Sequence, residues 1–208
     1  AELGGSCAHA RAAPQSGPAV TALAIAALVR TGTSADSPMV LRAVQYVLTF
    51  QQSDGGIYQR DSAIANYETS IAILALHECN TSGQYEEIIK KARRFLTVIQ
   101  WDESEGNTFA DPEYGGAGYG RHERPDLSNT TFLIDALKGV GASSDDPAIQ
   151  RALIFVSRSQ NLEGAYDILE VAPKNPDGGF YYTPANGGES QAGTTPNGGL
   201  RSYGSMTY

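Results

Sequence analysis

The chain has 208 residues, of which 41% are hydrophobic and 18% charged, with 23 glycines and a net charge of −8. This apolar content supports a folded core and excludes a chain that is disordered throughout. The acidic balance argues against a nucleic-acid partner, whose phosphates require a basic face. No apolar run approaches the roughly 18 residues of a membrane helix, so we expect no membrane span.

The first helical pair follows a short irregular segment. Residues 1–17 show weak periodicity, and we interpret them as a loose N-terminal arm. From Pro18, apolar residues recur at helical spacing until Gly32, a glycine typical of a helix end. The next helix begins at Ser37-Pro38, an N-cap followed by proline at the first helical position, and we expect it to end at Gln51-Gln52.

Two more helical pairs are predicted along the chain. They cover residues 67–78 with 85–100, and 128–138 with 147–160, separated by long glycine-rich loops at 101–126 and 161–199. In each pair the first helix is apolar almost all round, whereas the second carries a charged stripe. The first pattern is typical of an inner helix and the second of an outer helix. The sequence therefore predicts an all-α fold of helical hairpins in two layers.

A short signal returns after each second helix and marks the chain as a repeat protein. It consists of a glutamine, a pair of glycines and nearby aromatic residues. The glycine pairs begin at Gly55, Gly115 and Gly178, so successive copies are 60 and 63 residues apart. We interpret the glutamines and the Asp-Gly-Gly turns as hydrogen-bonded links between the outer helices and the loops. The repeats are predicted at about 18–60, 61–125 and 126–199, with the start of a fourth at 200–208.

These residues resemble the prenyltransferase and squalene-oxidase repeat family, which includes squalene–hopene cyclases and protein prenyltransferase beta subunits. The resemblance rests on the glutamine and Gly-Gly signal, and on the polar entries to the inner helices at 66–70, 127–131 and 201–207. It covers about residues 18–208 and implies one α/α-toroid domain, a partial α/α barrel. Because Tyr208 falls inside the expected fourth inner helix, we expect the natural protein to continue beyond it. A chain ending there is expected to form a homodimer.

The resemblance also implies a ligand site. Members of the family hold an isoprenoid chain or another ligand in a central cavity, and the starts of the inner helices line its mouth. The matching candidates are Tyr67, Glu68, Asp126, Asn129 and Tyr203. The expected partner is an isoprenoid or other apolar small molecule. The same residues also suit structural roles, since carboxylates favour helix N-termini and tyrosines pack.

Motifs for catalysis are not found in the chain. A squalene-cyclase-like enzyme uses an Asp-x-Asp-Asp acid motif, whereas Asp145-Asp146 precedes Pro147 and is typical of a helix cap. His77-Glu78-Cys79 offers two zinc ligands without a third, so we expect no metal site there and no cofactor. The favoured function is a terpene-cyclase- or prenyltransferase-like protein with a central apolar cavity. The alternative is a non-catalytic binding or scaffold domain on the same barrel.

Overall fold

The computed structural model describes residues 17–207, and the arm predicted at the N-terminus lies almost entirely outside them. The helices in this range are α1 (Pro18–Arg30), α2 (Pro38–Leu48), α3 (Ala65–Glu78), α4 (Glu86–Val98), α5 (Leu127–Gly139), α6 (Pro147–Arg158) and α7 (Gly204–Thr207). The described residues form isolated β-bridges but no named β-strand. The all-α prediction is confirmed.

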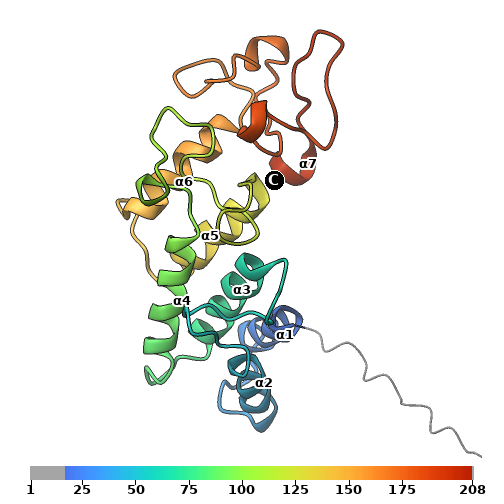
Figure 1. Cartoon of the computed structure of the whole chain (residues 1–208). Coiled ribbons are helices and arrows are strands. Elements are labelled where there is room, and N and C mark those ends of the chain that lie inside the picture. Colours follow the sequence, from blue (N-terminus) through green and yellow to red (C-terminus); the bar gives the residue numbers. More distant parts are fainter. Residues whose placement is uncertain (1–16, 208) are drawn as a thin grey trace, which may run out of the picture.

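The helices form two rows. Helices α1, α3 and α5 pack one after another, and each carries its own second helix, so that α2 lies on α1, α4 on α3 and α6 on α5. Figure 1 shows α1, α3, α5 and α7 following one arc, with α2, α4 and α6 along its outer side. This is the arrangement of a partial α/α toroid, with an inner and an outer layer of helices.

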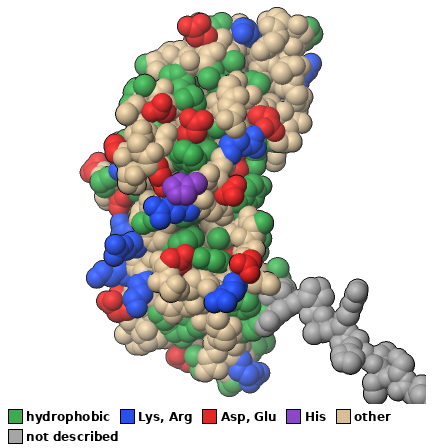
Figure 2. Space-filling model, in the orientation of Figure 1, with side chains coloured by type: hydrophobic (Ala, Val, Ile, Leu, Met, Phe, Trp, Pro, Cys, Tyr) green, Lys and Arg blue, Asp and Glu red, His purple; other side chains and the backbone are tan. Residues whose placement is uncertain are grey.

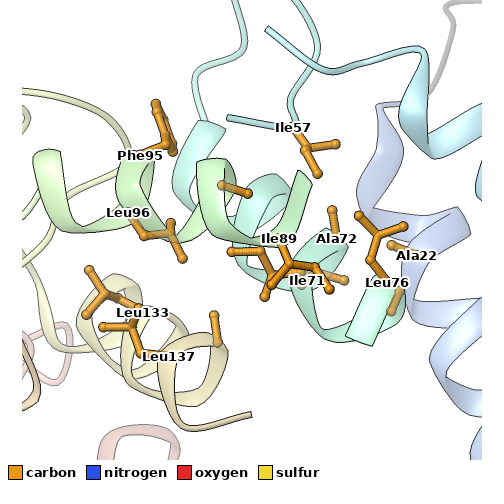
Figure 3. Packing of buried hydrophobic residues seen from close by; sticks show 14 of the residues in the cluster. Ala22, Ile57, Ile71, Ala72, Leu76, Ile89, Phe95, Leu96, Leu133 and Leu137 are labelled. Carbon is orange, nitrogen blue, oxygen red and sulfur yellow. The ribbon is translucent and has the colours of Figure 1, made fainter. Parts of the chain in front are cut away.

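Burial distinguishes the two layers as the sequence predicts. Ala72 and Leu76 of the inner helix α3 are fully buried between neighbouring helices. On the outer helix α4, Leu96 is buried on the side that faces the core, whereas Lys90 and Lys91 are exposed. Figure 3 shows this core, in which side chains from α1, α3, α4 and α5 meet. The apolar stripe of α4 therefore joins the two layers.

Helix α1 departs from the pattern of a fully buried inner helix. Val20 is 69% exposed and Leu23 is 54% exposed, although both belong to its apolar pattern. Among the described residues, α3 is the inner helix that packs against α1, and it covers one side only. The stripe through Val20 and Leu23 is therefore an open edge of the inner row.

The predicted ends of the outer helices were wrong by a few residues. Helices α2, α4 and α6 end at Leu48, Val98 and Arg158, before the glutamines at which they were expected to end. The reason is that these glutamines pair in antiparallel bridges, Gln51 with Ile57, Gln100 with Ala117 and Gln160 with Phe180. A residue in such a bridge has extended backbone and cannot continue the helix.

The glutamine side chains make the predicted links. The amide Nε2 of Gln100 donates to the carbonyl oxygens of Gly115 and Ala148, both at 2.9 Å. Nε2 of Gln160 donates to the carbonyl oxygen of Gly178 at 2.8 Å. Since Ala148 belongs to α6, Gln100 links its own loop and also reaches the next outer helix.

The first two Gly-Gly turns, at 54–56 and 114–116, pack against the following hairpin. A Cβ atom on Gly55 would lie 2.8 Å from the carbonyl oxygen of Lys91 in α4, and one on Gly115 would lie 1.9 Å from that of Arg151 in α6. Both glycines have positive φ angles, +94° and +85°. Glycine is therefore required here for the backbone conformation and for the close approach of two chain segments.

A threonine on each of three inner helices holds the residue after the Gly-Gly turn. The hydroxyl Oγ1 of Thr69 accepts the backbone N–H of Ile57 at 3.1 Å. Thr130 accepts that of Ala117 at 3.0 Å, and Thr207 accepts that of Phe180 at 3.2 Å. Thr207 lies in α7, so this short helix repeats the threonine contact of α3 and α5.

The long loop between α6 and α7 has a small core of its own. Val171, Tyr181 and Leu200 are buried together, and the hydroxyl of Tyr181 donates to the carbonyl oxygen of Arg158 at the end of α6. Two single 3₁₀ turns, Ala172–Lys174 and Ala185–Gly187, interrupt the segment. The loop therefore packs onto the third hairpin and leads the chain to α7.

Candidate functional site

The starts of α3 and α5 are joined by a buried polar network. The carboxylate of Asp126 caps α5 by accepting the backbone N–H of Asn129 at 2.8 Å, and it also accepts the amide Nδ2 of Asn129 at 2.8 Å. Nδ2 of Asn66 in α3 donates to the carbonyl oxygens of Gly118 at 2.9 Å and Asn129 at 3.1 Å. Asn66, Asp126 and Asn129 are fully buried. The network fixes the two helix starts relative to each other.

Aromatic side chains lie beside this network. The ring of Tyr67 meets the ring of Phe132 edge to face, with centroids 4.6 Å apart, and lies 5.7 Å from the ring of Tyr119. The hydroxyl of Tyr67 donates a hydrogen bond to the hydroxyl oxygen Oγ of Ser128 at 2.7 Å. All three rings are partly exposed. We call Tyr67, Tyr119 and Phe132 the aromatic cluster; it spans α3, α5 and the loop between α4 and α5.

The last loop brings two more tyrosines to the site. The hydroxyl of Tyr182 lies 3.5 Å from that of Tyr119, and the same side chain lowers the pKa of Asp126. The guanidinium of Arg124 lies over the Tyr182 ring, 5.5 Å from its centroid. Burial raises the pKa of Tyr203, with a further contribution from the charge of Asp126. Tyr203 therefore lies within electrostatic range of the same carboxyl group.

The environment of Asp126 acts on its ionisation in two directions. Burial raises the pKa of this carboxyl by disfavouring the charged form, while the hydrogen bonds from Asn129, the polar side chain of Tyr182 and the charge of Arg124 lower it. The net result is a pKa above the ordinary value of an aspartate. The site thus combines a buried carboxyl that holds its proton more tightly than usual with partly exposed aromatic rings.

Glu68 does not join this group. Its Oε2 atom accepts the backbone N–H of Gln59 at 3.1 Å, and its Oε1 atom lies where a Cβ on Gly17 would be. The side chain is 3% exposed. Glu68 therefore ties the start of α3 to the first loop and to the start of α1. Of the five predicted residues, the structure brings together Tyr67, Asp126 and Asn129, with Tyr203 near them.

Tyr119 and Tyr182 were missed by the sequence reasoning. Both lie in long loops, where no helical period indicates which residues return to the helix starts. The available signal was the setting of Tyr119 between Gly118 and Gly120, which repeats the glycine-aromatic pattern of the family signal. Tyr119 also lines a pocket of about 270 Å³ in front of α3, together with Ala65.

The chemistry that the described residues offer is limited. Residues 126–129 read Asp-Leu-Ser-Asn, so they supply one carboxyl group where an Asp-x-Asp-Asp motif would supply three. Between residues 17 and 207, no group of three or more His, Cys, Asp and Glu side chains could hold a metal ion. His77 is exposed and Cys79 is a buried free thiol. Over the same residues, no helix is both long enough and apolar enough to cross a membrane.

Comparison with known proteins adds the family. No curated protein matches the chain. Residues 9–167 match the family model of the squalene-hopene cyclase C-terminal domain. The matched range includes α1 to α6 and the polar network at the starts of α3 and α5. The match extends over more than half of the chain and agrees with the two layers of helices and the linking glutamines. The chain is a terpene-cyclase-like repeat protein and belongs to the squalene-hopene cyclase C-terminal domain family.

Proposed function

We propose that this protein binds an isoprenoid-type apolar molecule against the aromatic cluster, without converting it. The observation that carries the proposal is the group of partly exposed rings of Tyr67, Tyr119 and Phe132 at the starts of α3 and α5. Apolar ligands are typically bound by aromatic side chains with a few fixed polar groups beside them. Here those polar groups are the hydroxyls of Tyr67 and Tyr182.

Binding without protonation is favoured by the state of Asp126. Oδ1 of this carboxyl accepts the backbone N–H that caps α5, and Oδ2 accepts the amide of Asn129. Both oxygens thus accept hydrogen bonds that favour the charged carboxylate, which is the form with no proton to donate. Ser128 and Asn129 follow it with a hydroxyl and an amide, neither of which is an acid at neutral pH. The raised pKa alone does not make this site a proton donor.

A thermal-shift titration with farnesol tests the proposal. Farnesol is an isoprenoid without charge, so its binding reports the apolar site alone. A ligand that binds only the folded state stabilises it by about 2.7 kcal/mol at a hundredfold excess over Kd. We expect a concentration-dependent rise in Tm for the natural sequence and loss of that rise in Tyr67→Ala/Phe132→Ala, where the two rings in edge-to-face contact are removed.

Tyr166→Ala is the matched control. Tyr166 is 42% exposed in the last long loop and pairs with Phe109, away from the aromatic cluster. It should keep the full farnesol-dependent rise. The readout is the shift caused by ligand within each variant, so a lower starting Tm does not affect it. An unchanged shift in the double variant, or no shift in the natural sequence, would contradict the proposal and favour a scaffold domain. Cyclised product from squalene would contradict the non-catalytic part.

A further inference from the structure

We propose a second binding site, an anion pocket between α4 and the first Gly-Gly turn that takes a small molecule carrying a phosphate group on an apolar part. The pocket has a volume of about 600 Å³, which lies within the range of small-molecule sites. It is formed on the outer layer, by residues of α4, the turn at 51–55 and Arg121. It shares no residue with the aromatic cluster, so it does not depend on the function proposed above.

Three cations line this pocket, and two of them have no ionic partner. Lys91 and Arg94 are exposed and form no ion pair with any residue from 17 to 207, although the protein is acidic overall. Their neighbour Arg93, by contrast, pairs with Asp146. Figure 2 shows basic side chains gathered over α4. Unpaired cations that converge on a hollow are suited to a dianion.

Arg121, the third cation of the pocket, comes from a different part of the chain. It lies in the loop between α4 and α5, and its Nε atom is 3.8 Å from Oε1 of Glu105. At that distance the two groups attract each other but make no direct hydrogen bond. The guanidinium therefore keeps its donors for a ligand, and a bidentate contact to a phosphate is the geometry that arginine favours.

The carboxylate in the pocket wall is already occupied. Asp54 accepts the backbone N–H of Gly56 at 2.9 Å through Oδ1 and the hydroxyl of Tyr58 at 2.6 Å through Oδ2. These bonds hold the Gly-Gly turn in shape. Asp54 is thus engaged within the turn, and its one negative charge is outweighed by the three cations that line the pocket.

The floor of the pocket is apolar. Phe95 is 7% exposed and packs against the ring of Tyr58, with centroids 5.3 Å apart, while Val98 is 40% exposed. An inorganic ion would leave this surface in contact with water. An aromatic or aliphatic group attached to the phosphate would cover it and gain free energy in proportion to the apolar area buried. The pocket therefore fits a phosphomonoester better than phosphate itself.

Calorimetric titration with phenyl phosphate at low ionic strength tests this site. We expect binding that weakens as salt is added, because the attraction is between charges. Lys91→Gln/Arg94→Gln should lower the affinity by at least about tenfold, since hydrogen bonds to charged groups contribute on that order. The control is Lys90→Gln/Arg42→Gln, which removes two exposed cations outside the pocket and should bind as the natural sequence does.

Two further arms define the ligand. Inorganic phosphate should bind more weakly than phenyl phosphate, and Val98→Ser should reduce that difference in affinity. Equal affinities of the natural sequence for the two compounds would contradict the contribution of the apolar floor to binding. Co-sedimentation with phosphatidylcholine vesicles containing phosphatidic acid tests a lipid headgroup as the source of phosphate, and we expect the same bound fraction for both double variants. No binding of phenyl phosphate, or equal binding by the two double variants, would overturn the pocket.

Discussion

Asp126 has two roles that oppose each other at the scale of a single residue. Its carboxyl caps α5 and holds Asn129, and these bonds favour the charged form. Its complete burial disfavours the charged form more strongly, and the pKa is raised in the folded state. The folded protein therefore binds this proton more tightly than the unfolded chain, in which an aspartate has a pKa of about 3.9.

This difference predicts how stability depends on pH. As pH rises from about 4 through the raised pKa of Asp126, the unfolded chain has already lost the proton that the folded state still holds, so the free energy of unfolding falls. Asp126→Asn keeps a capping side chain and removes the titration. We expect the stability of Asp126→Asn relative to the natural sequence to increase over this range, measured by urea unfolding at several pH values.

Asp145→Asn provides the comparison for that measurement. It removes an exposed carboxyl near α6 and leaves the network at the starts of α3 and α5 unchanged. Its stability relative to the natural sequence gives the pH profile of a variant in which Asp126 is still present to titrate. A parallel pH profile for the two variants would mean that Asp126 titrates as it does in the unfolded chain.

At the scale of the element, the Gly-Gly turns join one hairpin to the next. The turn at 114–116 follows α4, yet its closest neighbour is the backbone of α6. The side chain of Gln100 makes the same connection through Ala148. The repeated signal therefore specifies the contact between neighbouring hairpins as well as the end of each one.

Gly115 and Gly141 both have a positive φ angle, so comparing them separates the cost of this backbone conformation from the cost of the close contact with α6. A Cβ on Gly115 would meet the carbonyl oxygen of Arg151, whereas one on Gly141, with φ +91°, would have nothing within 4 Å. Gly141→Ala should cost about 1–2 kcal/mol, the strain of a left-handed conformation alone. Gly115→Ala should cost about 1–3 kcal/mol more, because the turn must move away from α6. Urea unfolding of both variants measures the difference, and equal losses would show that the close contact adds nothing.

The elements that the sequence predicts well are those specified locally. Ser37 accepts the N–H of Val40 and Asp146 accepts that of Ala148, so both predicted caps are confirmed. The helical period predicted α1 to α6, because the outer helices carry one apolar stripe and the inner helices are apolar almost all round. The helix ends near Gln51 and Gln100 could not be placed in this way, since they depend on bridge partners further along the chain.

The candidate site was predictable in part for the same reason. Tyr67 and Asn129 lie in the first turns of α3 and α5, where the repeat register specifies them. Tyr119 and Tyr182 reach the site from loops whose path is determined by packing, and the partner of Glu68 is a backbone group in another loop. Local patterns carry no information about such contacts between distant segments.

At the scale of the whole molecule, α3 is the helix that connects the inner row. It packs against α1 on one side and α5 on the other, and α4 covers it from outside. We propose that residues 18–207 unfold as one cooperative domain, because neither neighbour keeps its core contact without α3. In repeat proteins each unit is stable only through its neighbours, so the central interface should control the whole chain.

Leu76→Ala tests this cooperativity. Leu76 is fully buried in α3, and its truncation should cost about 2–5 kcal/mol. The fluorescence of the single tryptophan, Trp101, reports on the loop between α4 and α5, whereas far-UV circular dichroism reports on all the helices. We expect both probes to shift to the same lower urea midpoint. Leu153→Ala, at a side chain 44% exposed on α6, should shift both only slightly. A Trp101 midpoint that stays in place while the helical signal shifts would mean that the hairpins unfold separately, because the loss at α3 would then not reach the loop that Trp101 reports.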